Sequence, residues 1–153
     1  MFPPLMKIMK PQFDLSNGIF LPKVTIKGKY YGDKTFPSLN NYLAAVGRNP
    51  KAGGRMKSDY MMICNNAIRT QLKRYKATNP IVLHYIYYEP KKGQKRDFMN
   101  CHFLFAKFFE DSLQVCGVIE NDNPKWLLNE THDFYYTDDP YIEVYIEEIE
   151  DEM

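Results

Sequence analysis

The sequence predicts a single-domain α/β (α+β) protein, a sandwich of helices against a mixed β-sheet. Its 153 residues, of which 44% are hydrophobic and 15% aromatic, suffice for one hydrophobic core. Segments with strand and helix periodicity alternate along the chain, and no repeat or low-complexity linker divides them. We therefore expect one domain over residues 1–153, with an irregular lead-in at 1–22 and an acidic tail at 147–153.

The first half of the chain is expected to hold two strands and two helices. Residues 23–32 alternate apolar with basic side chains, which is the period of a half-buried strand. A short helix is expected from Ser38, and a glycine-containing basic connection at 51–60 leads into a long helix over 54–75. Residues 79–90 are bounded by prolines and dense in β-branched and aromatic residues, which predicts a strand buried on most sides.

The second half is expected to hold one helix and two strands. A helix over 100–116 should end at Gly117, which can cap it. Strands are expected at 132–137 and 141–149. The second of these alternates isoleucine or valine with glutamate, which predicts one acidic, solvated face.

The few polar side chains of the helix expected over 100–116 share one stripe. At 100° per residue, Asn100, Lys107 and Asp111 fall within about 40° of one another. The opposite side carries the side chains expected in the core, which are His102, Phe105, Ala106, Phe109, Leu113 and Cys116.

Charge divides the chain into two opposite halves. Residues 21–107 hold 17 Lys and Arg against four acids, whereas residues 108–153 hold one Lys against fourteen acids. A basic, tyrosine-rich stretch suits a polyanionic partner, because neutralising phosphates releases counterions from nucleic acid. The alternative is that the two halves neutralise each other across the fold.

Cysteine spacing and hydropathy exclude several classes of protein. Cys64, Cys101 and Cys116 form no C-x-x-C pair, which indicates reduced thiols of an intracellular protein. No apolar run resembles a signal peptide or is long enough to cross a bilayer, so we expect a soluble, cytoplasmic protein with no membrane contact. Glycine-rich phosphate-binding motifs are absent, and no small-molecule cofactor is expected.

The three histidines do not support nucleophilic catalysis. His102 lies on the packing side of its helix and His84 in an apolar strand, so both are expected to be core residues. His132, at the start of the segment 132–137, is expected to be a loop residue that precedes the strand, with no partner.

Asp97, Lys107 and Asp122 are the candidate catalytic residues. Two carboxylates on either side of a lysine are the components of a metal-assisted phosphodiester site. Carboxylate oxygens hold Mg²⁺, and an ammonium stabilises the charge that develops on the phosphate. A Lys/Asp pair four residues apart, such as Lys107 and Asp111, is also a common surface feature of helices, so both interpretations stay open.

Two segments carry a resemblance to a known family. KRDFMNCHFLFAKFFEDSLQVCGVIENDN at 95–123 and SLNNYLAAVGRNPKAGGRMK at 38–57 resemble the RusA family of Holliday junction resolvases, which are commonly phage-borne endonucleases. The similarity covers residues 35–125. It implies a RusA-like mixed α/β fold, a homodimer, and paired nicks that resolve a four-way DNA junction.

The resemblance also assigns roles to single residues. It implies that Asp97 and Asp122 bind the metal and are catalytic, that Lys107 is the catalytic lysine, and that Asp111 and Asn100 support them. The implied metal is Mg²⁺, with Mn²⁺ as the alternative ion, and the implied setting is a bacterial or phage-infected cell. The residues expected to contact branched DNA are Lys91, Lys92, Lys95, Arg96, Arg69, Lys73 and Arg74.

Two positions depart from the family pattern. Met99 and Asn121 stand where the family has carboxylates, and a thioether is a poor ligand for a hard cation such as Mg²⁺. The alternative hypothesis is therefore a non-catalytic DNA-binding protein on the same fold. A third hypothesis is a protein-interaction module whose acidic C-terminal strand docks on a basic partner.

Overall fold

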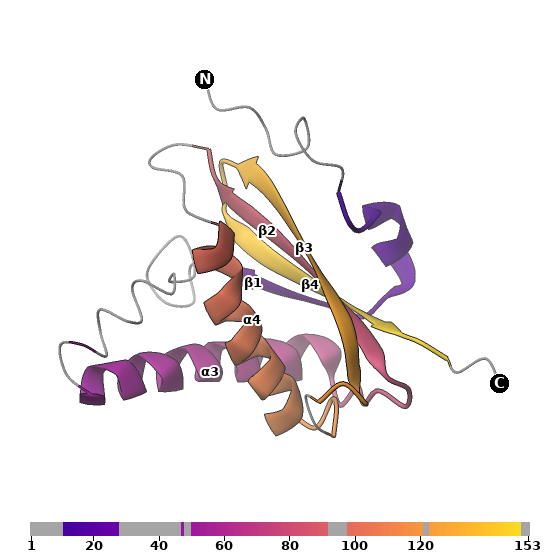
Figure 1. Cartoon of the computed structure of the whole chain (residues 1–153), viewed down its shortest axis with the longest axis horizontal. Helices are drawn as coiled ribbons and strands as arrows, with labels where there is room; N and C mark the ends of the chain where they lie inside the picture. The colour runs from indigo at the N-terminus through magenta and orange to yellow at the C-terminus, as the bar shows by residue number, and fades with distance from the viewer. Residues whose placement is uncertain (1–10, 28–46, 48–49, 92–97, 121–122, 151–153) are drawn as a thin grey trace.

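One four-stranded mixed sheet organises the protein. The computed structural model describes residues 11–27, 47, 50–91, 98–120 and 123–150. The strands follow one another in the sheet in the order β1-β4-β2-β3, with bounds β1 (Lys23–Lys27), β2 (Ile81–Pro90), β3 (Leu127–Thr137) and β4 (Tyr141–Glu148) (Figure 1). Helices α3 (Pro50–Leu72) and α4 (Phe98–Val115) pack on the sheet, and a short 3-10 helix, η1 (Leu15–Phe20), precedes β1. The predicted α/β class is confirmed.

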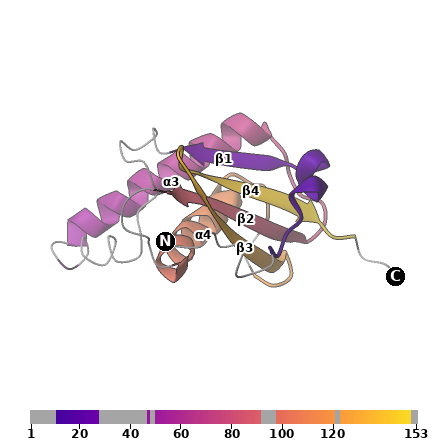
Figure 2. The same cartoon turned by 90° about the horizontal axis from the view of Figure 1, so that it is seen from above.

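The strands combine one parallel and two antiparallel pairings. β2 and β3 pair in parallel and are joined through α4, whereas β4 pairs antiparallel with both β1 and β2. The last strand of the chain is therefore an inner strand, as Figure 2 shows from above. Because a crossover helix runs back against its strands, the first turn of α4 lies near the carboxyl ends of β2 and β3 (Figure 1).

Alternating side chains of β2 build two hydrophobic clusters, one on each face of the sheet. On one face, Tyr85 is buried against the rings of Phe105 and Phe109 from α4, at centroid distances of 6.0 and 6.1 Å. On the other face, Ile86 packs in a smaller cluster with Phe13 and Tyr145. The sheet is thus covered on both faces.

Helix α3 is amphipathic, as its sequence predicts, but its ends differ from the expected ones. It begins at Pro50, so the segment expected as a connection at 51–60 is helical, and proline suits a first helical position. It ends at Leu72 because Lys73 and Arg74 adopt left-handed backbone conformations, with φ of 46° and 66°. The apolar positions expected to face the core are buried, among them Tyr60, Cys64, Ala67 and Ile68.

Helix α4 ends where the sequence predicts. Gly117 has a φ of +76°, a conformation that glycine adopts at low cost. Its N–H donates to the Gln114 carbonyl at 3.1 Å, and the Val118 N–H donates to the Leu113 carbonyl at 2.9 Å. These two bonds form a Schellman cap and satisfy carbonyls that the helix end would leave unpaired.

The acidic face of β4 is covered, which corrects the expectation of a solvated face. Glu143 is only 8% exposed, and its carboxylate lies 3.2 Å from the Lys23 ammonium. Beside it, the Tyr145 ring packs against Gly18 of η1. The lead-in expected to be irregular therefore contains an ordered helix that buries this face.

A carboxylate on β3 holds the covering segment in place. Asp133 is buried and accepts backbone N–H groups from Gln12 at 2.8 Å and from Phe13 at 3.0 Å. The Phe13 ring in turn stacks on His84 at a centroid distance of 3.9 Å. His84 also bonds to Thr131 and Glu147, so the expected core histidine is confirmed.

The segment expected as an acidic tail begins inside β4. Glu147 lies 2.9 Å from the His84 ring, and Glu148 accepts a 2.7 Å hydrogen bond from the Tyr75 hydroxyl. These acids are occupied within the chain and their strand is paired on both sides. The structure therefore does not support the hypothesis of an acidic strand that docks on a basic partner.

Two expected elements lie outside the described residues. They are the short helix from Ser38 and the part of the first strand that follows Lys27. Within the described residues, no helix has both the length and the apolarity needed to span a membrane.

Candidate nucleic-acid interface and nuclease site

Helix α4 carries Lys107 and Asp111 on the side that faces away from the core. Lys107 is exposed and Asp111 is half-buried, as the helical geometry predicts. Glu110 is also half-buried, and the remaining side chains from 104 to 113 are buried, namely Leu104, Phe105, Ala106, Phe108, Phe109, Ser112 and Leu113. No ion pair joins Lys107 to Asp111 in the described part of the chain, so both groups are available to solvent or to a ligand.

The other expected catalytic residues are not placed. Asp97 and Asp122 lie outside the described residues, as do Lys92, Lys95 and Arg96. Asn100 belongs to α4 by its backbone, but its side chain is outside the described part. The structure therefore neither assembles nor separates the expected catalytic set.

Asp97 and Asp122 lie beyond opposite ends of α4 in the chain. Phe98, next to Asp97, is the first residue of α4, and Asn123, next to Asp122, follows the connection that leaves the other end of that helix (Figure 1). A helix of this length spans about 27 Å. Among the described residues, no group of three or more His, Cys, Asp or Glu side chains could hold a metal ion. The described carboxylates thus do not fit a Mg²⁺ site by themselves.

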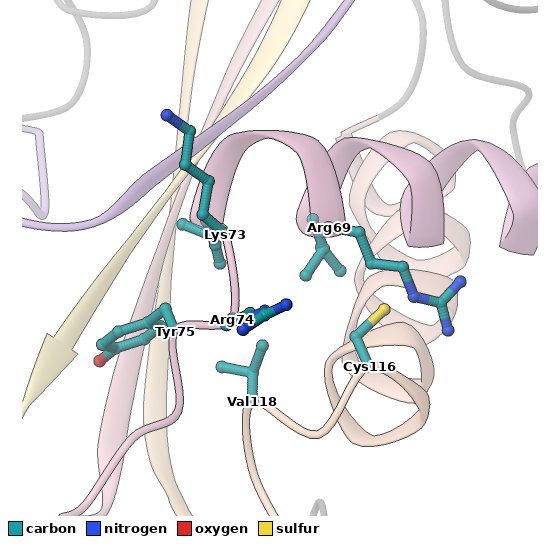
Figure 3. A pocket seen from close by; sticks show the side chains of 8 residues that line it. Arg69, Lys73, Arg74, Tyr75, Cys116 and Val118 are labelled. Atoms are coloured by element: carbon teal, nitrogen blue, oxygen red, sulfur yellow. The ribbon is translucent and has the colours of Figure 1, made fainter.

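Three of the expected DNA contacts gather at the end of α3. Arg69, Lys73 and Arg74 line an open pocket of about 480 Å³ (Figure 3). All three side chains are exposed, and within the described residues none forms an ion pair with a carboxylate. We call these residues the basic cluster.

Lys91 does not belong to the basic cluster. It follows β2, whereas the cluster precedes that strand, and a strand of this length separates its ends by roughly 30 Å. Its ammonium lies 4.0 Å from the Asp138 carboxylate. Together with the pair between Lys23 and Glu143, this contact shows that some basic residues of the first half are neutralised by acids of the second. No described acid neutralises the basic cluster in this way.

A hydrogen-bonded group beneath α4 was not anticipated from the sequence. His132, expected in a loop without a partner, lies in β3, where one ring nitrogen is 3.1 Å from Glu130 and the other 3.2 Å from the Tyr87 hydroxyl. Next to it, the Tyr85 hydroxyl donates to Glu110 of α4 at 2.7 Å. Burial, and then the Glu110 carboxylate, raise the pKa of Tyr85 well above its usual value.

This group follows from strand alternation. Parallel pairing sets Tyr85 opposite His132, so the two rings stack at 4.8 Å beneath the helix. The signal in the sequence is a period of two through Glu130, His132 and Phe134, which a loop assignment conceals. The group is enclosed in the core and connects α4 to both parallel strands.

Two of the cysteines are free thiols with different surroundings. Cys64 is fully buried, and burial raises its pKa far above the usual thiol value. Cys116 is half-buried and lines the pocket of the basic cluster, where partial burial raises its pKa although the nearby Arg69 acts in the opposite direction. The side chain of Cys101 lies outside the described residues.

Comparison with known proteins does not identify a family for this chain. No model of a known protein family matches the chain, and no curated protein matches it significantly.

Proposed function

We propose that the protein is a Mg²⁺-dependent endonuclease that cleaves branched DNA, including four-way junctions. The observation that carries the proposal is the placement of Lys107 and Asp111, one helical turn apart, on the exposed stripe of the helix that bears the RusA-like pattern. A lysine that is exposed on a largely buried helix, and that has no ion pair within the described residues, is available to a phosphate. The basic cluster supplies further attraction for a polyanion.

Each residue of the proposed site has a separate role. The Lys107 ammonium stabilises the negative charge that develops on the phosphate during cleavage. Asp97 and Asp122, with Asp111 in support, are the proposed Mg²⁺ ligands, and Asn100 is the proposed supporting amide. Because the described carboxylates form no metal-binding group, the metal proposal depends on Asp97 and Asp122. The proposed active form is a homodimer that places one nick in each of two strands, inside a bacterial or phage-infected cell.

The test is cleavage of a synthetic four-way junction with Mg²⁺ or Mn²⁺, analysed on a denaturing gel. We expect paired nicks by the wild-type protein and none by the Asp97→Asn and Asp122→Asn variants. Asp139→Asn is the matched control, because Asp139 is an exposed acid after β3 and separate in sequence from either aspartate. A wild-type protein that binds the junction under these conditions and leaves every strand intact would refute the endonuclease proposal.

A non-catalytic DNA-binding protein is the second candidate. Met99 and Asn121 favour it, because they stand where the family pattern has carboxylates. This candidate predicts junction binding that weakens steeply with salt and does not change in Asp97→Asn. It also predicts that titration of Mn²⁺ into the protein, followed by electron paramagnetic resonance, detects no bound ion.

A further inference from the structure

The pocket beside the basic cluster combines a cationic rim with an apolar floor. Figure 3 shows Arg74, in the turn after α3, above Val118, Arg69 of α3 extending past Cys116, and Lys73 pointing away on the opposite side. The apolar lining comes from both helices and the connections that follow them, and consists of Ile68, Leu72, Tyr75 and Val118. A ligand here would meet positive charge and hydrophobic surface together.

The rim carries a net positive charge. Two helices end beside the pocket, and each contributes a partial charge of about −0.5 from its aligned peptide dipoles. Three full positive side-chain charges exceed these partial charges, and none of the three is paired with a carboxylate in the described part of the chain. The helix ends therefore hold the cations locally, and enough positive charge remains to bind an anion.

The floor is rigid and buried. Val118 is 2% exposed, and its carbonyl accepts a 2.9 Å hydrogen bond from the Ala77 N–H, which ties the end of α4 to the turn after α3. The Tyr75 hydroxyl is held by Glu148 at 2.7 Å. Val118 and Tyr75 are thus held in place before any ligand arrives, which lowers the entropic cost of binding.

We propose that this pocket binds one unpaired nucleotide of a DNA strand. Its phosphate would lie between the guanidinium groups of Arg69 and Arg74, which match phosphate oxygens in geometry and charge. Its base would lie against Leu72 and Tyr75, the half-buried part of the apolar lining. A paired base cannot enter, because its Watson–Crick edge and both faces are covered in a duplex.

This inference rests on the proposed function only in taking DNA to be the polyanion. A nucleotide is favoured over an acidic peptide because the partly exposed Leu72 and Tyr75 line the pocket together with the cations, within a volume of about 480 Å³. A carboxylate side chain would engage the rim and leave the floor empty. The junction of a branched DNA supplies strands whose bases can leave the stack.

Cys116 gives a direct readout of the pocket, because its half-buried thiol lines it. The experiment measures alkylation of Cys116 by iodoacetamide at mildly alkaline pH, by peptide mapping, with and without a single-stranded oligothymidylate. We expect the oligonucleotide to slow labelling of Cys116 several-fold, and a blunt duplex of equal length to have little effect. Cys64 is fully buried and should stay unlabelled throughout.

Variants separate the pocket from other DNA contacts. Arg69→Ala and Arg74→Ala should each weaken protection by roughly tenfold in oligonucleotide concentration. Arg55→Ala is the matched control, because it removes the same side chain from an exposed position on α3, about 21 Å from Arg69 along the helix. Each variant is compared with its own unliganded rate, since Arg69 also affects the pKa of the Cys116 thiol.

The outcomes distinguish this inference from the proposed function. Protection of Cys116 by the single strand, without nicking of a junction, would support the pocket and refute the endonuclease. Nicking without protection would overturn the pocket alone. Equal protection by the duplex or by a glutamate-rich peptide would also overturn it, and thymidine monophosphate shows whether a free nucleotide suffices. Labelling of wild-type Cys116 with and without the oligonucleotide tests the pocket even if a variant fails to fold.

Discussion

The Tyr75 hydroxyl donates a 2.7 Å hydrogen bond to the Glu148 carboxylate and so joins the turn after α3 to the end of β4. The same carboxylate accepts the backbone N–H groups of Thr78 at 2.9 Å and Asn79 at 3.0 Å. Partial burial raises the pKa of Glu148, but these hydrogen bonds outweigh it and keep the pKa below its usual value. The Glu148 side chain thus ties the turn that leads from α3 into β2 to the end of β4.

Glu148 should make stability depend on pH. Because its pKa is lower in the folded than in the unfolded chain, it stabilises the fold above the ordinary glutamate pKa, and this contribution is lost as pH falls through the folded pKa. Urea unfolding at neutral pH should show Glu148→Gln to be less stable by about 1 kcal/mol, since solvent screens so exposed a group. The difference should shrink in acid. Glu150→Gln, at an exposed position, should match wild type at every pH, and parallel curves for Glu148→Gln and wild type would contradict the assignment.

Two glycines should respond oppositely to alanine. A Cβ at Gly18 would lie 2.6 Å from Cε1 of the buried Tyr145 ring, so Gly18→Ala should destabilise the protein by about 1–3 kcal/mol. A Cβ at Gly54, in α3, meets nothing within 4 Å, so Gly54→Ala should stabilise it by roughly 1 kcal/mol. Thermal unfolding followed by circular dichroism measures both. Equal melting temperatures for the two variants would show that η1 does not pack on β4 as described.

The left-handed end of α3 predicts a preference for glycine at position 73. An L-residue there costs about 1–2 kcal/mol relative to glycine. Lys73→Gly should therefore be more stable than Lys73→Ala by about 1 kcal/mol in chemical denaturation, although both lose the same charge. The reverse order would mean that α3 continues through this position.

Lys107 should matter for cleavage and not for stability. Lys107→Ala should reduce the junction nicking rate by roughly a hundredfold or more, as expected when one group that stabilises developing charge is removed. Its side chain is exposed, so the melting temperature should stay within about a degree of wild type. Lys125→Ala, another exposed lysine, is the matched control for the loss of one charge. Equal nicking by the two variants would remove Lys107 from the site.

Much of the fold could be predicted because periodicity reports which side of an element is apolar. The burial of Cys64 and Ile68 on α3, and the glycine end of α4, follow from local spacing and from the conformational freedom of Gly117. The exposure of Lys107 follows from the angle it makes with Phe105 and Phe109 around the same helix. These features depend on residues a few positions apart.

Other features depend on segments distant in sequence, and local patterns do not report them. The alternation around Glu143 shows that the two faces of β4 differ, but not that Phe13 and Gly18 cover the acidic one. The residue that follows the end of α3 is Lys73, so the sequence has no glycine there to indicate where the helix ends. For the candidate site, the exposure of Lys107 and the position of Asp111 one turn later follow from helical spacing, whereas Asp97 and Asp122 lie outside the described residues and their proposed proximity is not tested.

The inner position of β4 also sets the order in which the protein can fold. Lys23 pairs with Tyr145, and Leu83 with Ile146, so two strands made early must wait for one made near the end of the described chain. Contacts between residues so distant in sequence slow folding, because each closes a long loop. During synthesis, the edges of β1 and β2 that pair with β4 stay unpaired until β4 leaves the ribosome. Expression at low temperature, or with added chaperones, should therefore raise the folded yield.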